Sequence, residues 1–320
     1  MTEFLLHGGT LALAWFFLIN LALSAVVAAC AGSVTNRRTR VDSAGFWFAA
    51  RMLPGATALL FVGIVFVPSY WKFEPRDVVE GFDVTLTVLA LAAAALLAGG
   101  GVRGVRAWRL AVHRTRGWMQ SARPLALAGT RIPVSEIDAD APLMALVGVL
   151  RPRLVVTRGV VAALTDEELA ASVAHEVGHS RVRDNLTRLL MRAAPDLLTS
   201  TAAARAIERR WASAAEHRAD RLAGNDSAVA RCALASALVK VARLTPAVTP
   251  IAEPISTLID GGEIASRVER LLADATPSAR RRSALGWTAL VAAAGTTAIA
   301  YAPALWFVHT VTELLVHSLP

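Results

Sequence analysis

Cysteine is scarce in this chain, with two residues among 320, Cys30 and Cys232. They lie far apart in the sequence, which excludes a disulfide framework and a metal site built from a cysteine cluster. Charged residues are also few, at 18% of the chain, whereas apolar residue types make up 55%. This composition excludes an ordinary soluble protein and indicates a protein that lies in a membrane.

Charge is missing altogether from three long apolar runs, residues 11–31, 52–70 and 84–102. A fourth run, residues 283–312, contains no ionised side chain. Each run is long enough for a helix that crosses about 30 Å of hydrocarbon, which takes roughly 20 residues. We therefore predict a mainly α-helical membrane protein with about four transmembrane helices in contact with the lipid bilayer.

Arginine residues indicate which ends of these runs face the cytoplasm. They follow the first and third runs and precede the fourth, and they include Arg37, Arg38, Arg40, Arg103, Arg106, Arg109, Arg280, Arg281 and Arg282. By the positive-inside rule, this distribution predicts a multi-pass protein of a bacterial inner membrane with both termini extracytoplasmic. It also explains the net charge of +8 without a nucleic-acid partner, for which no motif is visible.

The apolar runs divide the chain into three parts. We assign residues 1–102 to three transmembrane helices, residues 103–282 to a cytoplasmic domain, and residues 283–320 to a fourth transmembrane helix with a short extracytoplasmic tail. Within the domain, short runs with β character precede segments with helical periodicity, which predicts an α+β lobe with one short sheet. The clearest strand is Leu154-Val155-Val156-Thr157.

One short motif in this domain carries the strongest chemical signal, His175-Glu176-Val177-Gly178-His179. Residues four apart share one face of an α-helix, so both imidazoles can reach a single metal ion. Glu176 then lies beside the metal, where it can take a proton from a water molecule. This spacing is typical of zinc peptidases, and with seven histidines in the chain a chance match is expected about once in a hundred such sequences.

The residues before the motif predict the start of the helix that carries it. Thr165-Asp166-Glu167-Glu168 has the pattern of a capping box, in which Thr165 caps the backbone of Glu168 and Glu168 reaches back. Leu169, Val173 and Val177 make the segment largely apolar, which predicts a buried helix. Buried histidines and a buried carboxylate need a partner, and a zinc ion is the partner that the motif favours.

A catalytic zinc site usually has a third protein ligand. The downstream candidates are Asp184, Asp196, Glu208, Glu216, His217 and Asp220. Glu216 and Asp220 are favoured because they are four apart on an expected helix, so that Glu216 can bind zinc while Asp220 hydrogen-bonds a ligating histidine. Two alternatives stay open: an exposed acid pair among the arginines of this helix, and His217 as the ligand.

These residues predict peptide hydrolysis. We expect Glu176 to act as the base that activates a zinc-bound water and passes its proton to the leaving amine. An extended protein or peptide substrate is expected to pair as an added strand with Leu154, Val155, Val156 and Thr157.

The motifs together resemble the gluzincin membrane metallopeptidases. The resemblance covers His175 to His179, then Arg183-Asp184, then Glu216 to Asp220. Two groups compete, the BlaR/MecR-type antirepressor receptors and the heat-shock and CAAX-prenyl protease type. Residues 147–156 and 164–169, with three apolar runs before the zinc helix and one after it, are more similar to the first.

The resemblance implies zinc ligands at His175, His179 and Glu216, a base at Glu176 and a supporting carboxylate at Asp220. It implies a zinc endopeptidase that cleaves a cytosolic or membrane-associated protein in antirepressor-like signalling. The penicillin-binding sensor domain of those receptors is expected to be lacking, because the sequence stops shortly after the fourth run. A quality-control protease and a non-catalytic sensor scaffold are the alternatives, and assembly into a homo-oligomer stays open.

Overall fold

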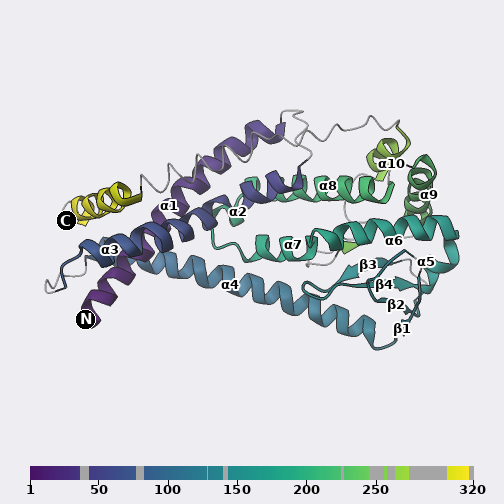
Figure 1. Cartoon of the computed structure of the whole chain (residues 1–320), viewed down its shortest axis with the longest axis horizontal. Coiled ribbons are helices and arrows are strands. Elements are labelled where there is room, and N and C mark those ends of the chain that lie inside the picture. Colours follow the sequence, from purple (N-terminus) through teal and green to yellow (C-terminus); the bar gives the residue numbers. More distant parts are fainter. Residues whose placement is uncertain are drawn as a thin grey trace.

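We describe the protein from a computed structural model. The structure describes residues 1–36, 43–76, 83–127, 129–139, 143–224, 227–244, 256–257, 264–273 and 301–316. Figure 1 shows an elongated molecule in which long helices occupy one end and a smaller lobe with a sheet occupies the other.

Among the described residues, three helical segments are long and apolar enough to cross a membrane; we call them the spanning segments, and they contain the first three predicted spans. The first is α1 (Thr2–Asn36), and the third is α4 (Val84–Met119), which Asp83 caps by accepting hydrogen bonds from the amides of Thr85 and Leu86. The second is continuous from α2 (Ala44–Phe61) through a π-helical turn, η1 (Val62–Phe66), to α3 (Val67–Phe73). These helices extend beyond the uncharged runs, because charged residues can continue a helix outside the hydrocarbon.

Residues 301–316 form a further helix that packs against the first two spanning segments. Trp15 Nε1 of α1 donates a hydrogen bond to Thr312 Oγ1 at 3.1 Å, and Ser69 Oγ of α3 donates to the carbonyl of Leu305 at 2.6 Å. The predicted fourth span begins at residue 283, so its first part lies outside the described residues. The number of spans beyond three and the side on which the lobe lies stay predictions.

The lobe contains a five-stranded mixed sheet in the order β1-β2-β4-β3-β5. The strands are β1 (Arg123–Pro124), β2 (Val134–Ile137), β3 (Met144–Val147), β4 (Arg153–Thr157) and β5 (Ser256–Thr257). β2 and β4 run parallel, whereas the pairs β1–β2, β3–β4 and β3–β5 are antiparallel.

Helices cover both faces of this sheet. The C-terminal part of α4 packs on one face, where Ala111 and partly buried Trp118 belong to one hydrophobic cluster with Ala145 and Val155. On the other face, Leu154 and Val156 belong to a core with residues of α6 (Asp166–Arg181) and α9 (Ala228–Leu244). An unbroken apolar run such as Leu154 to Val156 is what burial of a strand on both faces requires.

The prediction that a substrate pairs with Leu154, Val155, Val156 and Thr157 is wrong. These residues lie in β4, at the centre of the sheet, and their two backbone edges are already paired with β2 and β3. A strand can accept a further strand only on an edge that has free backbone groups. The unbroken apolar run that identified this strand in the sequence therefore also indicates that the strand lies inside the sheet.

The remaining elements of the lobe are mostly helical, as the sequence predicted. They are α5 (Arg158–Ala163), α7 (Asp184–Ala193), the 3-10 turn η2 (Leu197–Ser200), α8 (Ala202–Gly224) and α10 (Ile264–Leu272). The predicted capping box at the start of α6 is confirmed: Glu168 N donates to Thr165 Oγ1, and Thr165 N donates to Glu168 Oε2. α8 contacts α6 at one end and α1 and α2 at the other, so it joins the lobe to the spanning helices.

Candidate metal centre

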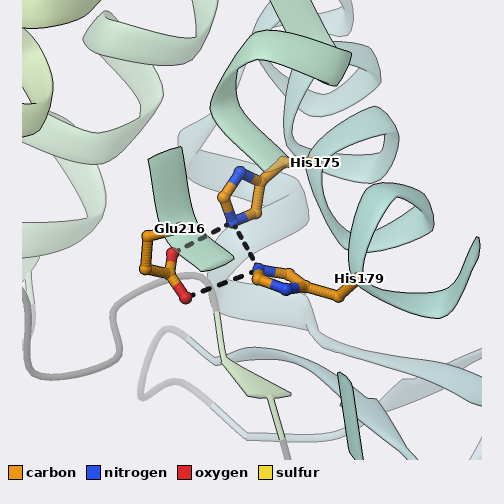
Figure 2. A group of neighbouring side chains, drawn as sticks. All are labelled: His175, His179 and Glu216. Carbon is orange, nitrogen blue, oxygen red and sulfur yellow. Dashed lines mark hydrogen bonds and ion pairs between the residues drawn. The ribbon is translucent and has the colours of Figure 1, made fainter. Parts of the chain in front are cut away.

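Two histidines and one glutamate meet where α6 packs against α8. His175 and His179 come from successive turns of α6, and Glu216 comes from α8 (Figure 2). The two Nε2 atoms are 3.1 Å apart, and the Glu216 carboxylate lies 3.3 Å from Nε2 of His175 and 3.5 Å from Nε2 of His179. All three side chains are buried. The structure thus brings together the three residues that the sequence analysis favoured as ligands.

The other ring nitrogen of each histidine faces an aspartate. His175 Nδ1 lies 3.0 Å from Asp220 Oδ1, one turn beyond Glu216 on α8. His179 Nδ1 lies 2.7 Å from Asp184 Oδ2, at the first position of α7. An ionised carboxylate only accepts hydrogen bonds, so each Nδ1 carries a proton and each Nε2 is left as the nitrogen that can bind a metal.

Four electron-rich atoms therefore converge on one buried point: two Nε2 lone pairs and both oxygens of Glu216. Such a group repels itself unless a proton or a metal cation lies among its members. Tetrahedral zinc with ligand bonds of about 2.0–2.2 Å separates its ligand atoms by about 3.3 Å. The two Nε2 atoms are 3.1 Å apart, and each lies 3.3 or 3.5 Å from one of the two Glu216 oxygens, which is close to that separation, so the residues suit a zinc ion.

Asp184 hydrogen-bonds the ring of His179, a role that was not predicted from the sequence. There, Asp184 was considered only as a possible metal ligand. Arg183 adopts a left-handed backbone conformation with φ of 57°, which turns the chain sharply between α6 and α7. This turn returns Asp184 to the ring of His179. Arg218 of α8 also donates to Asp184, at 2.6 Å and 2.9 Å, and holds the carboxylate in place. The sequence signal was the closeness of Arg183-Asp184 to the end of the motif.

Arg267 of α10 was missed entirely. Its guanidinium is buried and donates to Asp220 at 2.6 Å and 3.0 Å, and Nη1 lies 3.1 Å from Glu216 Oε2. A signal was available in the sequence. Arg267 shares a helical face with Ile264, Val268 and Leu271, and a charge on an apolar face needs a buried partner.

Glu176 lies between the two histidines in sequence and is also fully buried. Neither of its carboxylate oxygens has a hydrogen-bond partner among the described residues. Burial raises the pKa of this carboxyl, against the opposing effect of the two nearby histidines. Both oxygens are thus available to a water molecule or a substrate, as a general base requires.

The charges of the centre follow from its neighbours. For Glu216, burial raises the pKa, but His179 and Arg267 outweigh it and lower the pKa to about 2, so the carboxylate is ionised at neutral pH. For His175, burial lowers the pKa, but the hydrogen bonds to Asp220 and Glu216 raise it to about 9. The environment of His175 therefore favours positive charge at this point, and a cation bound to Nε2 would supply it in place of the second ring proton.

A second group of potential ligands lies at the far end of the spanning helices. It comprises Glu74 at the end of α3 together with His309 and Glu313 of the helix at residues 301–316. These side chains are only partly buried, and His309 Nδ1 lies 3.7 Å from Glu74 Oε2. The group at His175 is the better metal site, because its members are buried and each of its imidazoles faces a carboxylate.

Comparison with known families agrees with this geometry. Residues 120–285, just over half of the chain, match the family described as Peptidase family M48. The matched range contains the sheet and the helices that carry His175, Glu176, His179 and Glu216. No curated protein matches the chain.

Proposed function

Because this chain belongs to peptidase family M48, we propose that it is a membrane-bound zinc endopeptidase whose metal is held by His175, His179 and Glu216. The observation that carries the proposal is the convergence of three buried residues, each with a ligand atom close enough to the others to share one metal ion. A metallopeptidase follows from the family. The ligand assignment, the base and the substrate are our proposals.

The residues around the centre have different roles in the proposed reaction. A bound zinc ion would supply a water molecule of lowered pKa and would polarise the scissile carbonyl. Glu176 would accept a proton from that water and deliver it to the leaving amine, for which its unpartnered oxygens are suited. Asp184 and Asp220 hold the imidazoles in the orientation and tautomer that present Nε2.

A cavity beside the centre offers a place for the substrate. It has a volume of about 210 Å3 and includes His179 and Asp184 together with residues of the loop between β3 and β4. Leu146, Val149 and Leu150 give it apolar walls. We propose that an apolar side chain next to the scissile bond binds there, with the substrate backbone near the end of β3 rather than along β4.

The biological role that we propose is regulatory cleavage. The BlaR/MecR-type resemblance supports a defined cytosolic or membrane-associated substrate, and the arginine distribution supports a cytoplasmic lobe in a bacterial inner membrane. A quality-control protease would instead cleave many unfolded clients. The two roles differ in substrate range.

The test compares protein N-termini in cells that express the wild-type chain and in cells that express Glu176→Gln. We expect new N-termini that depend on Glu176, and one substrate or a few if the role is regulatory. Many clients would favour quality control. An identical set of N-termini in both cells, with equal amounts of folded protein, would contradict the peptidase proposal.

A further inference from the structure

The turn between α7 and α8 is held by the three spanning segments that the structure describes. From α1, the buried Asn20 donates a hydrogen bond to the carbonyl of Pro195 at 2.8 Å and accepts one from Leu197 N at 3.2 Å. From α4, Arg103 donates to the carbonyl of Ala194 at 2.8 Å. The polar backbone of this turn is therefore satisfied by side chains of the membrane helices rather than by water.

Glycines of the spanning helices lie in close contact with this turn, so that a larger side chain at these positions would clash with it. A Cβ atom added at Gly100 of α4 would lie 2.7 Å from the carbonyl oxygen of Ala193, and one added at Gly104 would lie 2.8 Å from its Cβ. On α2, a Cβ at Gly55 would meet the ring of Pro195 at 3.3 Å. The glycines allow backbone-to-backbone contact, so the turn and the spanning helices have one relative position.

Arg51 of α2 makes four hydrogen bonds to this turn and to the two helices that flank it. It is completely buried within a spanning segment, where an arginine is costly unless it is paired. Its guanidinium donates to Asp196 at 2.6 Å, Thr199 at 2.7 Å, Glu208 at 3.0 Å and the carbonyl of Met191 at 3.2 Å. These acceptors belong to α7, to the turn and to α8, so a single planar group fixes the angle between the two helices.

Both of those helices lead to the metal centre. α7 begins at Asp184, which orients His179, and α8 carries Glu208 and Glu216 about 12 Å apart along its axis. Apolar contacts reinforce the connection, because Trp47 of α2 belongs to the same core cluster as Trp211 and Ala215, the neighbour of Glu216. A shift of α8 at Glu208, the residue that Arg51 contacts, therefore has to be transmitted over about two helical turns to reach Glu216.

We propose that Arg51 is a positioning residue for the metal ligand Glu216. It holds α8 at the angle to α7 at which the Glu216 carboxylate meets both imidazoles, so the arrangement of the membrane helices sets the affinity for zinc. The inference rests on the proposed function only in taking Glu216 as a zinc ligand. A buried ion pair is weak evidence for stability, and a role in fixing one geometry is the better account of its cost.

The test measures metal binding by the full-length chain in detergent, without reference to cleavage. Arg51→Gln removes the charge, and Arg51→Lys keeps the charge but cannot reach all four acceptors. Arg109→Gln changes an exposed arginine of α4 and is the matched control. We measure zinc affinity by competition with a chelator and the visible absorption of the cobalt-loaded protein, which reports the ligand set.

We expect Arg51→Gln to lower zinc affinity about 10- to 100-fold, as loss of an orienting group around a metal typically does. Its cobalt spectrum should shift toward that of Glu216→Gln, Arg51→Lys should recover part of the affinity, and Arg109→Gln should match the wild type. A merely structural role would lower thermal stability but leave the cobalt spectrum of the folded protein unchanged.

A folded Arg51→Gln protein with wild-type zinc affinity and cobalt spectrum would overturn the inference. If Arg51→Gln does not fold, Glu208→Ala removes only one of the four contacts and should lower zinc affinity about threefold to tenfold. Unchanged affinity in that variant would overturn the inference equally. Altered metal binding in a chain that cleaves nothing would leave this inference standing and would count against the peptidase proposal.

Discussion

His179 Nδ1 and Asp184 Oδ2 lie 2.7 Å apart, although a helix end and a sharp turn separate the two residues in the chain. The contact is the shortest between an imidazole and a carboxylate that the structure records at this centre. A carboxylate at this position fixes the tautomer of the ring and the direction of the opposite nitrogen. Asp184 therefore supports His179 in the way that Asp220 supports His175.

We expect Asp184→Ala to lower zinc affinity about 10- to 100-fold, because the ring of His179 loses its orienting partner. Asp184→Asn should lose less, since its amide oxygen still accepts a hydrogen bond from Nδ1. Chelator competition on the purified protein measures both variants. Asp138→Asn, which changes an exposed acid paired with Arg158, is the control and should bind zinc as the wild type does.

Replacement of the proposed base separates metal binding from catalysis. Glu176→Gln should keep full zinc content, because Glu176 is not among the three converging ligands. Its cleavage rate should fall at least about 100-fold, the contribution typical of a general base. Elemental analysis and a peptide-cleavage assay on the same preparation check both statements, and normal cleavage would show that another group is the base.

The close approach of α6 and α8 depends on Gly178. A Cβ atom there would lie 3.3 Å from Ala219 Cα and 3.5 Å from Ala219 Cβ, one residue from Asp220. Gly178→Val should push the helices apart and lower zinc affinity about tenfold or more, because Glu216 and the imidazoles come from opposite sides of this contact. Gly178→Ala needs a shift of only a few tenths of an ångström. Equal zinc affinity in all three proteins would mean that the helices adjust freely.

The capping box at the start of α6 makes stability depend on pH. For Glu168, burial raises the pKa, but the hydrogen bonds from Lys240, Ser236 and Thr165 outweigh it and lower the pKa below its usual 4.5. A carboxyl whose folded-state pKa is lowered stabilises the fold above pH 4.5, and this contribution disappears as the pH falls through the folded-state pKa.

Glu168→Gln should therefore lower the free energy of unfolding by about 0.5–1 kcal/mol at pH 7, since glutamine keeps the capping bond but loses the partly exposed ion pair with Lys240. The difference from wild type should vanish in strongly acidic buffer. Thermal unfolding in detergent over a pH series measures it. Glu167→Gln, at the exposed neighbouring position, is the control, and a difference that grows on acidification would refute the assignment.

Some features of this protein followed from the sequence because they depend on local geometry. The spacing of His175 and His179 fixes two imidazoles on one face of a helix, whatever the rest of the chain does. The pattern Thr165 to Glu168 fixes where that helix begins, and runs without charge fix which helices can enter hydrocarbon. The pairing of Glu216 with Asp220 was favoured for the same reason, their separation by one helical turn.

Other features depended on contacts between distant segments, which no local pattern encodes. Asp196 and Glu208 were candidate ligands by residue type, and only the packing of α2 against α8 shows that they bind Arg51 instead. The order of the strands decided that β4 is internal, because pairing with β2 and β3 is a long-range choice. Arg267 reaches Glu216 and Asp220 only because α10 docks on α8 and α9. The sequence thus determined the chemistry of the motif, and the tertiary structure decided which distant side chains complete it.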